Sequence, residues 1–104
     1  MTVRGVIFDM DGVLTDSEPL ICSSAMAMFA ERGLQVRADD FRPFVGMGEN
    51  RYIGGVAEKY GLAIDLAEAK RRTYAIYLER VPGHLEPFPG AVELAAELRD
   101  MGFR

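Results

Sequence analysis

A short apolar run that ends abruptly in acidic residues is the feature that most constrains how this chain can fold. Gly5-Val6-Ile7-Phe8 is followed at once by Asp9-Met10-Asp11-Gly12. A continuous apolar run of this length, bounded by a turn signal, is typical of a strand buried on both faces of a parallel sheet. A buried helical segment is the alternative, but the run is too short for it. The sequence therefore predicts a buried strand over residues 5–8 and an α/β fold.

Helical spacing of apolar residues dominates the rest of the chain. Five such stretches cover residues 17–33, 39–45, 52–61, 66–77 and 91–102. Ser17 is a typical N-cap residue for the first stretch, and Gly33 is a natural residue to end it. Gly54 and Gly55 weaken the third stretch, because each glycine inside a helix costs about 1 kcal/mol relative to alanine. A Pro/Gly-rich segment, residues 82–90, precedes the last stretch, so we expect a strand, a helical block and a return to an α/β layer.

Composition narrows the range of partners and compartments. The formal net charge is −4, which argues against non-specific nucleic-acid binding because that needs a basic surface. No run of 18 apolar residues is present, so we expect no membrane span. Cys22 is the single cysteine, expected to be a buried thiol, and it can form no internal disulfide. Residues 1–4 lead straight into the predicted strand rather than into a signal peptide, so we expect a reducing compartment, the cytoplasm.

Two carboxylates follow the predicted strand at a spacing of two residues. Residues at that spacing in an extended chain point to the same side, which places Asp9 and Asp11 at the carboxyl end of the strand, where open α/β sheets bind ligands. Two carboxylates held together repel unless one is protonated or a cation lies between them, and Mg²⁺ is the first candidate. One aspartate can also act as a nucleophile that becomes phosphorylated, with its neighbour as general acid and base.

Two simpler interpretations of these carboxylates are a polar turn and an EF-hand loop. A polar turn alone leaves unexplained the apolar run before the aspartates and Thr15-Asp16-Ser17 after them. An EF-hand loop needs oxygen ligands where Val13 and Leu20 stand, and glycine where Leu14 stands. We therefore favour a catalytic site.

At these residues the chain resembles the haloacid dehalogenase superfamily, in particular its β-phosphoglucomutase-like and phosphoglycolate-phosphatase-like branch. The matching string is VIFDMDGVLTDSEP, residues 6–19, and Phe88-Pro89-Gly90-Ala91 before an amphipathic helix resembles the return to that family's core. The resemblance implies a doubly wound α/β core, present here only as its first strand and one core helix, with an inserted all-helical cap. It divides the chain into a first strand and catalytic loop, the cap and the return to the core, at residues 1–15, 16–85 and 86–104.

The resemblance also implies a role for individual residues. Asp9 would be the nucleophile that attacks phosphorus and Asp11 the general acid and base, with Mg²⁺ bound by the Asp9 carboxylate and the Asp11 backbone carbonyl. The implied substrate-binding residues are Ser17, Glu18, Gly46 and Arg51. Phosphatases and phosphomutases of the family carry the second aspartate, whereas dehalogenases and phosphonatases lack it. The resemblance therefore predicts a Mg²⁺-dependent hydrolase of a small phosphorylated metabolite.

A sugar phosphomutase and a non-catalytic regulatory domain are the alternatives. β-Phosphoglucomutases usually carry histidine where this chain has Ile21, and their cap loop has a lysine before the glycine and an arginine three residues after it. Here Val45 and Glu49 occupy those loop positions around Gly46. Without those basic groups to hold a second phosphate, we expect a phosphatase rather than a mutase, and Arg51 is the remaining candidate for that role.

The family pattern further requires groups that this chain does not contain. These are a serine or threonine after a second strand, a later lysine, and a pair of acidic residues after a later strand. The chain stops at Gly102-Phe103-Arg104, where the second strand should begin. A lone strand has no parallel neighbour with which to pair. We therefore expect a fragment that lacks the C-terminal half of the core and has no substantial phosphatase activity by itself.

Overall fold

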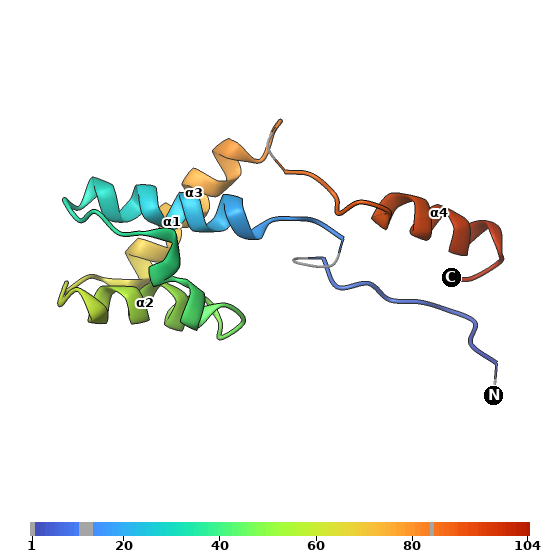
Figure 1. Cartoon of the computed structure of the whole chain (residues 1–104), viewed down its shortest axis with the longest axis horizontal. Helices are drawn as coiled ribbons and strands as arrows, with labels where there is room; N and C mark the ends of the chain where they lie inside the picture. The colour runs from blue at the N-terminus through green and yellow to red at the C-terminus, as the bar shows by residue number, and fades with distance from the viewer. Residues whose placement is uncertain (1, 11–13, 84) are drawn as a thin grey trace.

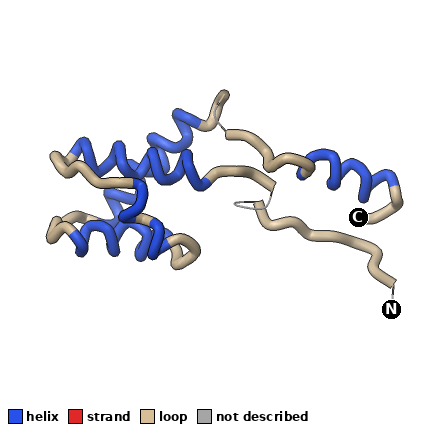
Figure 2. The backbone as a smooth tube through the Cα atoms, viewed as in Figure 1, coloured by secondary structure: helices blue, strands red, loops and turns tan. Residues whose placement is uncertain are grey.

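Helices provide the regular structure of this computed structural model, which describes residues 2–10, 14–83 and 85–104. In chain order they are α1 (Glu18–Glu31), the 3₁₀ turns η1 (Ala38–Asp40) and η2 (Arg42–Phe44), α2 (Glu49–Lys59), α3 (Leu66–Arg80) and α4 (Ala91–Asp100). Figures 1 and 2 show α1, α2 and α3 gathered at one end of the molecule and α4 at the other. The five predicted helical stretches are thereby confirmed, the second as two consecutive 3₁₀ turns. None of the described helices is both long enough and apolar enough to cross a bilayer.

Local sequence explains where these helices begin and end. Pro19 stands in the first turn of α1, where its missing N–H costs nothing. Ser17 occupies the N-cap position of α1 as predicted, although its side chain makes no capping hydrogen bond. Asp65 caps α3 by accepting a hydrogen bond from the backbone N–H of Glu68 at 3.3 Å. Gly33 follows α1 with a φ of +79°, a conformation that glycine adopts at little cost, so α1 ends there.

The hydrophobic core lies between α1, α2, α3 and the 3₁₀ turns. Phe29 of α1, Phe41 between the turns and Tyr52 of α2 form its centre. Their rings follow one another, with centroids 6.1 Å apart for Phe29 and Phe41 and 4.8 Å apart for Phe41 and Tyr52. Such aromatic pairs add about 0.5–1.5 kcal/mol to the stability that burial provides. Residues 18–80, called the helical unit below, therefore bury a core of their own.

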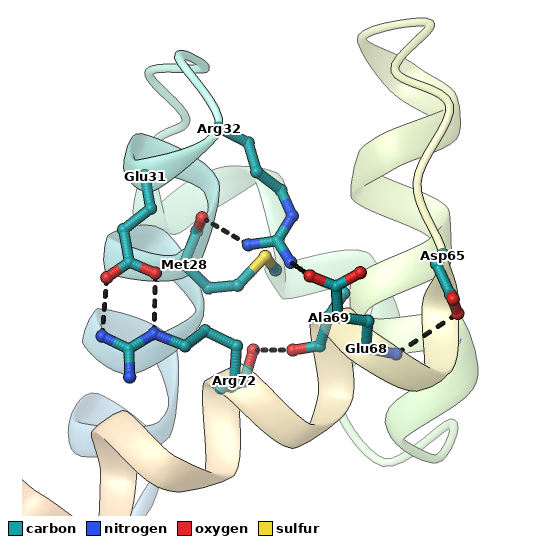
Figure 3. A network of polar contacts seen from close by, with 8 residues as sticks. Met28, Glu31, Arg32, Asp65, Glu68, Ala69 and Arg72 are labelled. Carbon is teal, nitrogen blue, oxygen red and sulfur yellow. Dashed lines mark hydrogen bonds and ion pairs between the residues drawn. The ribbon is translucent and has the colours of Figure 1, made fainter.

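Charged side chains join the exposed edges of α1 and α3. Arg72 of α3 donates two hydrogen bonds to Glu31 of α1, from Nε at 2.8 Å and from Nη2 at 2.7 Å (Figure 3). These bonds lower the pKa of Glu31. Arg32, just after α1, reaches Glu68 of α3 and donates to the backbone carbonyl of Met28 (Figure 3). Because exposed ion pairs are screened by water, these contacts position α3 against α1 more than they stabilise the fold.

One carboxylate is buried inside the helical unit and is fully paired. The side chain of Asp40 is only 1% exposed, and it accepts hydrogen bonds from the backbone N–H of Arg37 at 2.8 Å, from Nζ of Lys59 at 2.5 Å and from the hydroxyl of Tyr60. The bonds from Lys59 and then Tyr60 hold the pKa of Asp40 well below its usual range. Asp40 in turn raises the pKa of Lys59. This carboxylate therefore ties the 3₁₀ turns to the end of α2.

The molecule is longer than a compact domain of its size. Its Cα radius of gyration is 17.1 Å, whereas a compact chain of this length would have about 13 Å. No residue of α4 is buried, and Figure 1 shows α4 set apart from the helical unit. The chain therefore has two parts, the helical unit and a second part made by the N-terminal segment and α4.

Two linkers that run side by side connect these parts. Thr15 and Pro87 form an antiparallel β-bridge, and the backbone N–H of Asp16 donates to the carbonyl of Glu86 at 2.9 Å. The chain thus enters and leaves the helical unit at one place. This arrangement is typical of a block inserted between two segments of another layer.

The prediction of a buried strand over residues 5–8 is wrong in this structure. None of these residues belongs to a strand, and Ile7 is 100% exposed. The N–H of Val6 donates to the carbonyl of Arg104 at 2.8 Å, and the N–H of Arg104 donates to the carbonyl of Arg4 at 3.1 Å. This is the pattern of parallel strands, but one paired residue does not make a strand. The part of the chain that the structure describes therefore contains no doubly wound sheet.

Two neighbouring glycines of α2 should respond oppositely to alanine. A Cβ at Gly54 would meet Leu66 at an ordinary 3.9 Å, so Gly54→Ala should raise the free energy of unfolding by up to about 1 kcal/mol through helix propensity. A Cβ at Gly55 would lie 2.5 Å from the ring of Phe44, so Gly55→Ala must displace that ring, and we expect a net loss of about 1 kcal/mol or more. Urea unfolding followed by circular dichroism measures both variants. Equal stability of the two would contradict the packing of Phe44 against α2.

The buried carboxylate should make stability depend on acid pH. Because folding lowers the pKa of Asp40, its contribution is present above the unfolded pKa of about 4 and is lost as the pH falls below it. Asp40→Asn should lower the melting temperature at neutral pH by roughly 5–10 °C, and this difference should shrink in acid. Asp39→Asn is the matched control, because Asp39 pairs with Arg42 at an exposed site and should change the melting temperature by less than about 2 °C. Thermal unfolding across the acid range gives both values, and a difference independent of pH would refute the role of the charge.

Candidate functional site

A cavity of about 380 Å³ lies in the helical unit beside the N-terminal segment. Its walls come from the start of α1, the loop before α2, α2 itself and α3, and Met10 of the N-terminal segment also lines it. Figure 1 shows the loop before α2, in green, projecting toward that segment. The polar side chains of the wall are Glu18, Glu49, Tyr52, Thr73, Tyr74 and Tyr77. The volume lies within the range of small-molecule sites.

Glu18 and Tyr52 form the wall between α1 and α2. The hydroxyl of Tyr52 donates a hydrogen bond to Oε1 of Glu18 at 3.0 Å. Burial, with smaller contributions from Cys22 and Glu18, raises the pKa of Tyr52 well above its usual range. The hydroxyl of Tyr52 therefore keeps its proton. Burial also raises the pKa of Cys22, which is half-buried rather than fully buried, so this thiol is not a nucleophile at neutral pH.

Glu49 also lines the cavity, from the first turn of α2. A hydrogen bond from Tyr74 of α3 makes the largest contribution to lowering the pKa of Glu49. The backbone N–H of Glu49 itself and the charge of Lys70 lower this pKa further. Because the start of a helix also favours negative charge, Glu49 is ionised at neutral pH.

Asp9 is exposed, and the residue that follows it in the chain, Met10, lines the cavity. Its Oδ1 accepts a hydrogen bond from the backbone N–H of Met10 at 2.9 Å. The carbonyl of Met10 in turn accepts bonds from the backbone N–H groups of Leu14 and Thr15, each at 3.0 Å, and from the hydroxyl of Thr15 at 3.1 Å. These bonds hold Met10 against Leu14 and Thr15. Asp11 lies outside the described residues, so its placement beside Asp9 stays a prediction.

The motif that contains Asp9 can be assigned by comparison with known proteins. Residues 3–104 match the family described as "Hydrolase: haloacid dehalogenase-like hydrolase". The chain belongs to the haloacid dehalogenase-like hydrolases. The resemblance that the sequence predicts is thereby confirmed.

Similar proteins of this family extend well beyond the matched region. The chain is 44% identical over 105 residues to Protein SUPPRESSOR OF QUENCHING 1, chloroplastic, of Arabidopsis thaliana, a match that covers 98% of this chain and 10% of that protein. It is 30% identical over 101 residues to phosphoglycolate phosphatase of Caulobacter vibrioides, with 93% of this chain and 43% of that protein covered. The crystal structure of a hydrolase from Pseudomonas syringae shares the fold, with a TM-score of 0.75 at 22% identity over 97% of this chain and 47% of that one. The chain spans less than half the length of each of these three proteins. The cytoplasmic location that the sequence suggests stays a prediction.

The structure of this haloacid dehalogenase-like chain brings together some of the predicted substrate-binding residues. Glu18 and Gly46 both line the cavity, and Ser17 is buried immediately before Glu18. Arg51 is not among the described residues of the lining. Its Nη1 donates a hydrogen bond to Oε2 of Glu58 at 3.1 Å. The guanidinium of Arg51 is therefore paired with a carboxylate on α2 outside the cavity lining. The substrate-binding roles of these residues stay predictions.

Several residues of the cavity wall are not recognisable as site residues in the sequence. Helical spacing assigns Tyr52, Thr73 and Tyr77 to apolar stripes, and Tyr74 falls outside those stripes. One signal is available, because Thr73, Tyr74 and Tyr77 cluster within a single turn of a helix. That cluster indicates a polar and aromatic face on α3, but it does not show what the face surrounds.

The donor chemistry near Asp9 fits a magnesium ion. Mg²⁺ usually binds through one or two carboxylates and keeps water and substrate phosphate oxygens as its other ligands. Asp9 offers an exposed carboxylate of this kind, and the Asp11 carbonyl is the second ligand that the resemblance implies. Across residues 2–10, 14–83 and 85–104, no three metal-ligating side chains gather in one place. The exposed carboxylate of Asp9 fits an open site in which Mg²⁺ keeps water or substrate oxygens as further ligands.

Replacing Tyr52 by phenylalanine should test the link between the cavity wall and the core. Tyr52→Phe keeps the ring packing on Phe41 but removes the hydrogen bond to Glu18, so we expect the free energy of unfolding to fall by about 1 kcal/mol. Tyr74→Phe is the control, because the 43% exposed Tyr74 should lose less than about 0.5 kcal/mol. Denaturant titration of both variants measures the difference. A Tyr52→Phe variant as stable as the parent would show that this bond does not hold the wall.

Proposed function

We propose that this chain carries the nucleophile and the substrate-selecting cap of a magnesium-dependent phosphatase that acts on small phosphomonoesters. The observation that carries the proposal is the exposed carboxylate of Asp9 next to Met10 in the cavity wall, with Asp11 two residues further on. A nucleophile must be accessible to its substrate, and the leaving group of an ester needs a cavity beside it. The Caulobacter relative, named a phosphoglycolate phosphatase, supports phosphoester hydrolysis as the reaction class.

The reaction proceeds in two steps through a phosphorylated aspartate. First, a carboxylate oxygen of Asp9 attacks phosphorus, the bond from phosphorus to the leaving oxygen breaks, and Asp11 gives that oxygen its proton. Asp11, now ionised, then takes a proton from a water molecule whose oxygen attacks phosphorus, which releases inorganic phosphate and restores Asp9. When bound, Mg²⁺ screens the repulsion between the carboxylate and the phosphate. The hydrogen bond from Met10 keeps one oxygen of Asp9 oriented.

The cavity favours hydrolysis over phosphomutase chemistry. A mutase must hold a second phosphate, which requires cationic groups. None of the described residues that line the cavity is a lysine, an arginine or a histidine. Arg51, the candidate for that role, is paired with Glu58. We therefore propose transfer of the phosphoryl group to water.

The test follows phosphate release by the protein expressed from its gene. With p-nitrophenyl phosphate we expect turnover that requires Mg²⁺, stops with EDTA and falls by at least about 100-fold in Asp9→Asn, because asparagine cannot form the covalent intermediate. Asp39→Asn, at an exposed site outside the cavity lining, should keep the parent rate. Full activity in Asp9→Asn, or without metal, would overturn the proposal. For the isolated 104-residue chain we expect no substantial turnover, because its described residues form no sheet to support the site.

A further inference from the structure

Three hydroxyl groups of the cavity wall, those of Tyr52, Thr73 and Tyr74, donate their protons to other groups of the protein. Tyr52 donates to Glu18 at 3.0 Å, and Thr73 donates to a backbone carbonyl of α3 at 2.8 Å. Tyr74 donates to Glu49. A hydroxyl that has given its proton to one partner offers a ligand only its lone pairs. These three hydroxyls, together with the carboxylate oxygens of Glu18 and Glu49, therefore present acceptors to whatever enters the cavity.

The start of α2 is a possible source of donors, because helix N-termini attract anions. Gly48 and Glu49, at this helix start, both line the cavity. Glu49, however, is itself an acidic residue in the first turn of this helix, where the helix dipole favours its negative charge. An anion that belongs to the protein therefore already occupies part of this site, which leaves less of it for an anionic ligand.

The net charge of the cavity wall also disfavours an anionic ligand. Two glutamates and no cationic side chain are among its described residues. Lys70 acts on Glu49 electrostatically but does not line the cavity, and Arg51 is held by Glu58 and lies over the ring of Phe44 at 5.0 Å. An anionic group in a cavity lined by two glutamates and no described cation is repelled, whereas an ammonium or hydroxyl group finds acceptors.

We propose that this cavity selects phosphomonoesters whose leaving group presents hydroxyl or ammonium donors, and that it rejects leaving groups that carry a carboxylate or a second phosphate. The inference rests on the proposed phosphatase function and adds the class of substrate. It separates this chain from the Caulobacter relative, which is named for phosphoglycolate, an ester with a carboxylate. The three tyrosines of the wall also offer faces on which the carbon skeleton of such a leaving group can pack.

Two matched pairs of esters test this preference with the protein expressed from its gene. Phosphoethanolamine is compared with phosphoglycolate, and glycerol 3-phosphate with 3-phosphoglycerate, so that each pair differs in a donor against a carboxylate. We expect kcat/KM at least tenfold higher for the donor in each pair, which corresponds to about 1.4 kcal/mol. Equal or reversed values would overturn the inference.

Charge-neutral variants show whether the glutamates cause the preference. Glu49→Gln and Glu18→Gln keep the shape of the side chain and remove its charge, so we expect the ratio within each pair to fall at least threefold. Glu68→Gln is the control, since Glu68 pairs with Arg32 outside this cavity and its removal should leave the ratio unchanged. An undiminished ratio in both cavity variants would overturn the assignment to these carboxylates.

Binding to Asp9→Asn separates a failure of the inference from a failure of the proposed function. This variant cannot form the phosphorylated intermediate, so calorimetry with the same four esters reports binding alone. Tighter binding of the donor esters supports the inference even if the parent protein turns over no ester. Equal affinities, or no binding of any ester, overturn the inference and leave hydrolysis of p-nitrophenyl phosphate as a separate result.

Discussion

The position of Tyr52 is the constraint on which both the core and the cavity depend. Its ring packs against Phe41 in the centre of the helical unit, and its hydroxyl reaches Glu18 at the cavity wall. One side chain therefore belongs to two environments, an apolar one that fixes α2 against the 3₁₀ turns and a polar one that fixes α2 across from the start of α1. Because packed interiors resist small displacements, the spacing of α1 and α2 is set by the core. The width of the cavity follows from that spacing.

Sequence patterns predict the helices of this chain well and its strand badly, for a physical reason. A helix satisfies its backbone within its own segment, so apolar spacing and terminal residues such as Gly33 suffice to locate it. A strand needs a partner that is distant in the chain, and the described residues offer residues 4–6 only the backbone of Arg104. The apolar run over residues 5–8 indicates what such a segment is suited to, but Ile7 stays exposed because no described layer covers it. The molecule is elongated for the same reason, because no described layer packs over the N-terminal segment and α4.

In the candidate site, too, the sequence indicates local features but not contacts between distant residues. The acidic motif is local, so the sequence alone singles out Asp9 and Glu18, but the end of a strand on which it places Asp9 is not present in the described residues. Pairings across the fold could not, since neither the hydrogen bond from Tyr52 nor the partners of Asp40, 19 and 20 residues away, leave a pattern in the sequence. Arg51 illustrates a partial signal, because Glu58 lies seven residues later on the same helix face and competes for its charge.

The charges of this region imply a division of labour in the proposed reaction. Asp9, Glu18 and Glu49 are all acidic, and a phosphate dianion brought near them is repelled unless cations compensate it. The cavity has no cationic lining residue among those described, and in the proposed reaction a bound metal ion would supply this compensation. The cavity wall then recognises the rest of the substrate through the hydrogen-bond donors that the leaving group carries. Separating the recognition of charge from the recognition of donors in this way lets one phosphoryl-transfer site keep its chemistry while the cavity wall sets which alcohol is released.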